Sequence, residues 1–116
     1  MVKHLFIGLK SGSVSAGSSV TLSYTYTADL TLHKMMITHA DGTAAPEAEI
    51  FAQIGKATLI NKAPAVPFSA DWSKVPELDE TQPAHIQLVI TITNTSSTAQ
   101  SYLVSLHYIR KAEEAV

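Results

Sequence analysis

The strongest constraint on this chain is a pair of alternating runs between residues 85 and 110. In residues 86–93, isoleucine or leucine occupies every second position, with glutamine, valine or threonine between. Residues 101–109 repeat the pattern with tyrosine, valine and leucine. A period of two with many β-branched residues is typical of half-buried strands. We predict two strands that are joined by the polar turn 94–100 and pair as an antiparallel hairpin, whose apolar face needs a second layer.

Other alternating runs predict five more short strands, at residues 5–9, 20–27, 30–39, 49–53 and 57–60. The segment 61–84 contains four prolines, so we expect it to be irregular and to fold back over one end of the core. It has room for one helical turn at most, between residues 73 and 81. The chain is therefore predicted to be all-β, a jelly-roll-like antiparallel β-sandwich of seven to eight short strands in a single domain, residues 1–116.

The run 30–39 changes phase at its centre. Leu30 and Leu32 share one phase, whereas Met35 and Ile37 share the other, and the switch falls at His33 and Lys34. A β-bulge at this point would restore a single buried face. A strand that is covered on both faces is the alternative.

Charge and cysteine content narrow the classes of function. The formal net charge of −2 does not favour nucleic-acid binding, and the absence of cysteine excludes disulfides and thiolate metal sites. The apolar stretch 2–9 is too short for a signal peptide, and no stretch approaches the length of a membrane span. We expect a soluble protein that is made in the cytoplasm and is not exported.

The five histidines are candidate metal ligands, but none has the HxH or HExxH spacing that places two ligands together. His33 and His39 lie roughly 20 Å apart along an extended strand, too far to share an ion. His85 and His107 can approach each other only across the predicted terminal hairpin, and no carboxylate has a spacing that ties it to them. We therefore expect neither a metal site nor another cofactor.

Catalytic motifs are also missing from the sequence. There is no G-x-S-x-G nucleophile elbow and no glycine-rich phosphate loop. The carboxylate pairs Glu47/Glu49 and Asp79/Glu80 lie in polar loops, where solvated charges are the ordinary interpretation. The prediction is a protein without enzymatic activity.

Apolar residues outside the clearest strands are the candidate contact surface. They lie in the N-terminal segment and in the proline-rich loop, and comprise Leu5, Ile7, Val66, Phe68 and Trp72. The alternative is that these residues cover the core of their own subunit. Trp72 is also the best candidate for stacking on a sugar, whereas Tyr24 and Tyr26 share the phase of Val20 and are expected in the core or an interface.

The chain as a whole resembles the single jelly-roll proteins that build or decorate viral shells. The resemblance rests on the Gly/Ser-rich stretch 11–19, the threonine-rich strand 20–27, the loop 63–68 and the ending 86–97 followed by one last strand. It implies a virion structural protein that acts through its surfaces and symmetry. No functional residue is carried over from the resemblance.

We therefore expect a non-enzymatic virion capsid or decoration protein that self-associates or binds other virion proteins, without nucleic acid or a membrane span. The alternative is a carbohydrate- or receptor-binding β-sandwich, such as a tail-spike or lectin-like module. Trp72 separates the two, because an assembly protein buries it against another subunit and a sugar binder leaves it exposed beside polar groups. A third possibility, a cupin-like enzyme, requires several histidines to converge inside the barrel.

Overall fold

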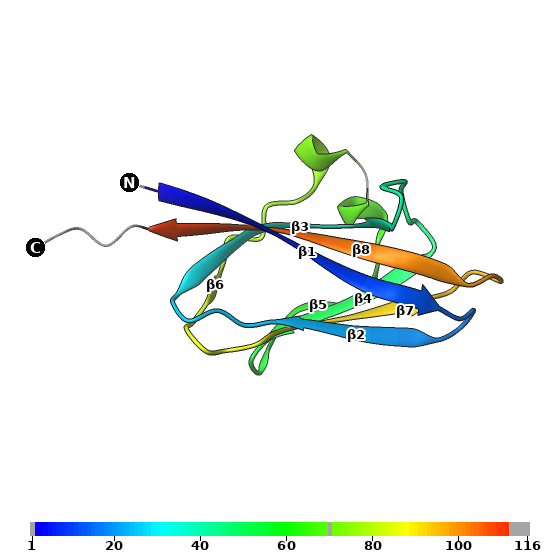
Figure 1. The fold of residues 1–116 in the computed structure, drawn as a ribbon, viewed down its shortest axis with the longest axis horizontal. Helices are drawn as coiled ribbons and strands as arrows, with labels where there is room; N and C mark the ends of the chain where they lie inside the picture. The colour runs from blue at the N-terminus through cyan, green and yellow to red at the C-terminus, as the bar shows by residue number, and fades with distance from the viewer. Residues whose placement is uncertain (1, 70, 112–116) are drawn as a thin grey trace, which may run out of the picture.

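The computed structural model describes residues 2–69 and 71–111, and it shows two four-stranded sheets packed face to face (Figure 1). One sheet has the order β1-β8-β3-β6, formed by Val2–Val14, Gln100–Lys111, Leu30–His39 and Glu80–Gln82. The other has the order β2-β7-β4-β5, formed by Ser19–Tyr24, Leu88–Asn94, Ala48–Ile54 and Ala57–Pro64. All neighbouring strands are antiparallel, and this order is that of an eight-stranded jelly roll. The predicted fold class is confirmed, although β1 and β8 are longer than expected.

The prediction of a terminal hairpin is wrong. β7 pairs with β2 and β4, whereas β8 pairs with β1 and β3 in the opposite sheet. The buried side chain of Asn94 fixes the crossing, because its amide donates hydrogen bonds to the carbonyl oxygens of Val14 and Thr98. The apolar faces of β7 and β8 thus cover each other across the core instead of lying side by side in one sheet.

The predicted β-bulge in the third long strand is confirmed. β3 changes register against β8 between Leu32 and Lys34, which leaves His33 as the extra residue. Leu32 and Met35 are both fully buried, so the bulge keeps one face of β3 in the core. As a result, His33 and Lys34 are adjacent and both partly exposed on the outer face.

The core lies between the two sheets and is mainly apolar, and one of its buried polar networks is centred on Gln82. The Tyr108 hydroxyl donates to Gln82 Oε1 at 2.7 Å, and the Gln82 amide donates to the carbonyl oxygens of Tyr24 and Ile86. Burial raises the pKa of Tyr108, with Tyr24 adding to the shift. Gln82 thereby satisfies one backbone acceptor at the end of β2 and one in the loop before β7.

The proline-rich segment connects β5 to β6. It contains two 3-10 turns, η1 (Val66–Phe68) and η2 (Trp72–Lys74), drawn in green above β3 in Figure 1. The Leu78 N–H donates to the His33 carbonyl, and Lys34 Nζ donates to the Trp72 carbonyl. The bulge therefore anchors this segment against the sheet. Within the described residues, no helix has the length and apolar character needed to cross a membrane.

Candidate functional site

The outer face of the β1-β8-β3 sheet carries a row of imidazoles and aromatic rings. The strand register places Phe6 of β1 opposite His107 of β8, and His107 opposite Lys34 of β3. His4 lies diagonally from His107 on β1, and the bulge adds His33 on the other side. Three histidines that are far apart in sequence therefore gather on one surface.

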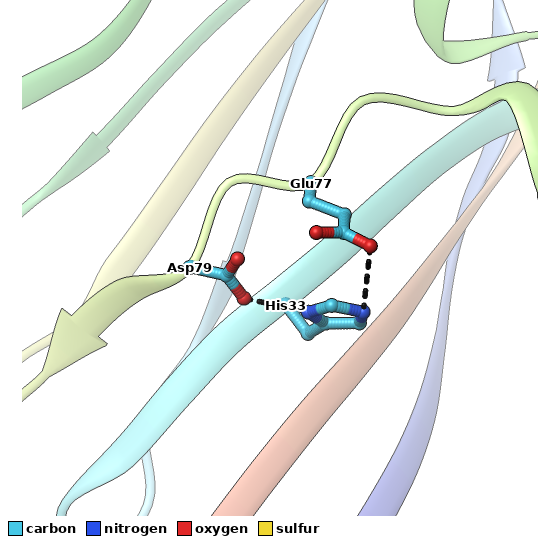
Figure 2. A group of neighbouring side chains, drawn as sticks. All are labelled: His33, Glu77 and Asp79. Atoms are coloured by element: carbon cyan, nitrogen blue, oxygen red, sulfur yellow. Dashed lines mark hydrogen bonds and ion pairs between the residues drawn. The ribbon is translucent and has the colours of Figure 1, made fainter.

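His33 is held between two carboxylates of the loop that precedes β6 (Figure 2). Its Nδ1 lies 2.6 Å from Asp79 Oδ1, and its Nε2 lies 3.8 Å from Glu77 Oε1. The imidazole is largely covered, with 20% of its side chain exposed, whereas 61% of the Glu77 side chain and 53% of the Asp79 side chain are exposed. One oxygen from each carboxylate and one imidazole nitrogen lie within 4.8 Å of one another. The two carboxylates therefore approach different nitrogens of the same ring, with Asp79 at hydrogen-bond distance from Nδ1 and Glu77 farther from Nε2.

His107 occupies the centre of the row. Its Nε2 lies 2.9 Å from His4 Nδ1, its ring stacks on Phe6 with centroids 4.4 Å apart, and it meets His33 edge-on at 5.2 Å. Burial lowers the pKa of His107, and the nearby His33, His4 and Lys34 lower it further. Its Nδ1 is buried and has no hydrogen-bond partner among the described residues.

An apolar patch continues from this row toward the other end of the same face. We define the outer apolar patch as Phe6, Gly8, Met36, Trp72 and Leu103, which line an open hollow of about 440 Å³. Phe6 is 68% exposed, more than the two other exposed large apolar residues of the described chain. This patch is not part of the core of the sandwich, since it lies on the side of the sheet that faces away from β2-β7-β4-β5.

A second polar cluster lies at the opposite end of β3. His39 Nε2 is 2.5 Å from Glu47 Oε1, and His39 Nδ1 is 3.1 Å from Thr43 Oγ1. Burial and the neighbouring Glu47 raise the pKa of Tyr102 to about 12. The Thr43 hydroxyl donates to Asp41, so it is not held as a nucleophile activated by His39. We interpret this cluster as structural.

The outer face of the other sheet is lined with hydroxyl groups. Ser19 pairs with Thr93 and Thr21 with Thr91 across β2 and β7, at 2.7 Å and 3.3 Å between the hydroxyl oxygens. Beside them lies an open hollow of about 420 Å³, lined by Ser19, Glu49, Phe51, Lys62, Thr91 and Thr93. One aromatic ring among fixed hydroxyls and charges is a composition that can bind polar ligands.

The five predicted contact residues do not lie on one surface. Leu5 and Ile7 pack against the core, and Phe68 is buried in it. Val66 is 55% exposed, and Trp72 is partly exposed in the outer apolar patch. A role of these residues in contacts between subunits stays a prediction. Sequence reasoning passed over Phe6, which points outward because it alternates with Leu5 and Ile7.

The histidines that lie close together in the structure are not the pair that the sequence suggested. His107 meets His4 and His33 instead of His85, which lies in the loop before β7 and therefore next to the other sheet. Glu77 and Asp79 were not singled out as partners of a histidine, because more than forty residues separate them from His33. The phase change at His33 was the available signal, since bulges redirect side chains.

No protein-family model and no curated protein matches the chain. Among solved structures, the chain is similar to the Drosophila NLP core, a crystal structure described as providing insight into pentamer formation and histone binding. The two are 11% identical, the match covers 92% of this chain and 99% of that chain, and the TM-score is 0.38. A likeness at this level carries no argument about the function of this chain.

Proposed function

We propose that the protein is a non-enzymatic structural protein of a virion, a capsid or decoration protein that acts by self-association. The observation that carries the proposal is Phe6, a large aromatic side chain of the outer apolar patch that is 68% exposed on the edge strand β1. Exposed apolar patches next to a strand edge favour contact with another protein. Jelly rolls are also an architecture of viral capsid domains.

The partner that suits this surface is a second copy of the chain. β1 lies at the end of its sheet, so the side of the strand away from β8 presents unpaired backbone groups. Phe6 is the midpoint of residues 2–10, the regular part of β1 before its bulge. Antiparallel pairing of two β1 strands about Phe6 would place both Phe6 rings side by side on the outer face. Such a contact is self-complementary and closes with two-fold symmetry.

The test is the substitution Phe6→Gln, with Ile86→Gln as the matched control. Ile86 is also an exposed large apolar residue, at 38%, but it lies in the loop before β7, against Gly55. Removal of a central aromatic residue should weaken self-association by about 30-fold or more, as for an interface hot spot. The self-association constants are measured by sedimentation equilibrium. Equal constants for the wild type and Phe6→Gln, or an equal loss in Ile86→Gln, would contradict the proposal.

The alternative function is binding of a carbohydrate or a receptor. The hydroxyl-lined hollow beside Phe51 favours it, because sugars bind to aromatic faces surrounded by hydrogen-bonding groups. This function predicts that the protein stays monomeric and binds glycans, and that Phe51→Ala abolishes the binding. If self-association is lost in Phe6→Gln, the assembly function is favoured over this alternative.

A further inference from the structure

We propose that the His4–His107 pair makes self-association through β1 sensitive to pH, so that mildly acidic conditions separate the subunits. This inference rests on the proposed function and adds a regulation to it. The pair lies beside the proposed contact, because His4 is two residues from Phe6 on the outer face of β1 and His107 is the β8 residue opposite Phe6. Imidazole is the side chain whose charge ordinarily changes between about pH 5 and pH 8.

A hydrogen bond joins the two imidazoles across β1 and β8. His4 Nδ1 and His107 Nε2 are 2.9 Å apart, so one nitrogen carries the proton and the other accepts it. When both rings are protonated, both nitrogens are donors and the hydrogen bond is lost. The bond therefore exists only while at least one of the two imidazoles is neutral.

The surroundings of His107 favour its neutral form. Lys34 lies opposite it on β3, and His33 meets it edge-on with ring centroids 5.2 Å apart. A cationic His107 ring also has a hydrogen on its buried Nδ1, which has no hydrogen-bond partner among the described residues. The carboxylates of Glu77 and Asp79 approach His33, so they balance charge on that ring first. Burial lowers the pKa of His107, and the neighbouring basic groups lower it further.

Association through β1 would cover His4 without giving it a negative partner. With Phe6 opposite Phe6, antiparallel pairing places His4 opposite Gly8 of the second copy and diagonally next to Lys10 of that copy. His4 and Lys10 are both exposed in the single chain. Glycine has no side chain to accept a hydrogen bond, and like charges on paired strands are destabilising. A proton on His4 is therefore less favourable in the dimer than in the single chain.

The sign of the pH dependence follows from this difference. A dimer that binds fewer protons than two separate chains is favoured at high pH, and it weakens as the pH falls through the range in which histidine titrates. The His4–His107 hydrogen bond and the neutral form of His107 are lost in the same direction. Acidification thus adds charge to the outer face next to Phe6 and opposes the contact.

The experiment is sedimentation equilibrium of the full chain at about pH 7.5 and about pH 5.5, at one ionic strength. An ordinary histidine passes from about 10% to about 90% protonated over this range. We expect the wild type to associate about 10-fold or more weakly at the lower pH. In His4→Gln, which keeps a polar side chain that does not titrate, the two constants should differ by about 3-fold or less, whatever the constant at neutral pH. His107→Gln should also reduce the difference.

The control is His85→Asn, which removes a histidine outside the pair and places asparagine at a positive φ that this residue tolerates. Its two constants should differ as much as those of the wild type. Equal association of the wild type at both pH values would overturn the pH dependence and leave self-association standing, whereas a monomer at both values would contradict both proposals.

Three results would overturn the assignment to this pair of histidines. The first is a full pH dependence in His4→Gln, and the second is its loss in His85→Asn. The third is loss of association at both pH values in both glutamine variants, since the rings would then act through contact and not through charge.

Discussion

At the scale of single residues, two buried tyrosines have opposite hydrogen-bonding states. The Tyr108 hydroxyl donates to Gln82 Oε1, whereas the Tyr102 hydroxyl has no hydrogen-bond partner among the described residues. Tyr108→Phe leaves the buried Gln82 oxygen unpaired and should lower the free energy of unfolding by about 1–3 kcal/mol. Tyr102→Phe, as the matched change, removes a buried hydroxyl that has no partner, so it should leave the free energy of unfolding unchanged or raise it by about 1 kcal/mol. Urea unfolding measures both, and equal losses would contradict this interpretation.

At the scale of elements, the bulge in β3 is the feature that connects the core to the candidate site. Deletion of His33 removes the extra residue and leaves Leu32 and Met35 facing the core, so the protein should still fold, with a loss below about 2 kcal/mol. Deletion of Met36 instead turns Ile37 to the outer face and should cost more than about 4 kcal/mol. Urea unfolding compares the two deletions. A similar loss in both would mean that His33 is not the extra residue.

The elements also show how far the sequence could predict this molecule. Period-two alternation predicted the long strands, and the phase change between Leu32 and Met35 predicted the bulge, because each follows from one strand alone. Alternation does not specify which strand is the neighbour, so β7 and β8 were paired with each other by mistake. For the same reason His33 and Asp79 could not be matched: only the pairing of β3 with β6, with Leu32 opposite Glu80, brings them together.

At the scale of the whole molecule, the two outer faces of the sandwich differ in character. The β1-β8-β3 side carries the outer apolar patch and ends in a strand of 13 residues, whereas the β2-β7-β4 side carries hydroxyl pairs and a polar hollow. A long edge strand with an exposed aromatic residue promotes pairing with other chains. This pairing leads to aggregation in a monomeric protein, whereas an assembly protein can use it to form a specific contact. This asymmetry is the physical basis for proposing self-association through β1.

The most direct test of self-association is the molar mass of the wild-type protein, measured by light scattering over a dilution series. We predict a mass that stays at two or more times the 12.4 kDa of one chain across the micromolar range. The same series with EDTA should give the same mass, because the proposed contact is formed by β1 and contains no metal ligand. A mass of one chain at every concentration would contradict the proposed function and favour the ligand-binding alternative.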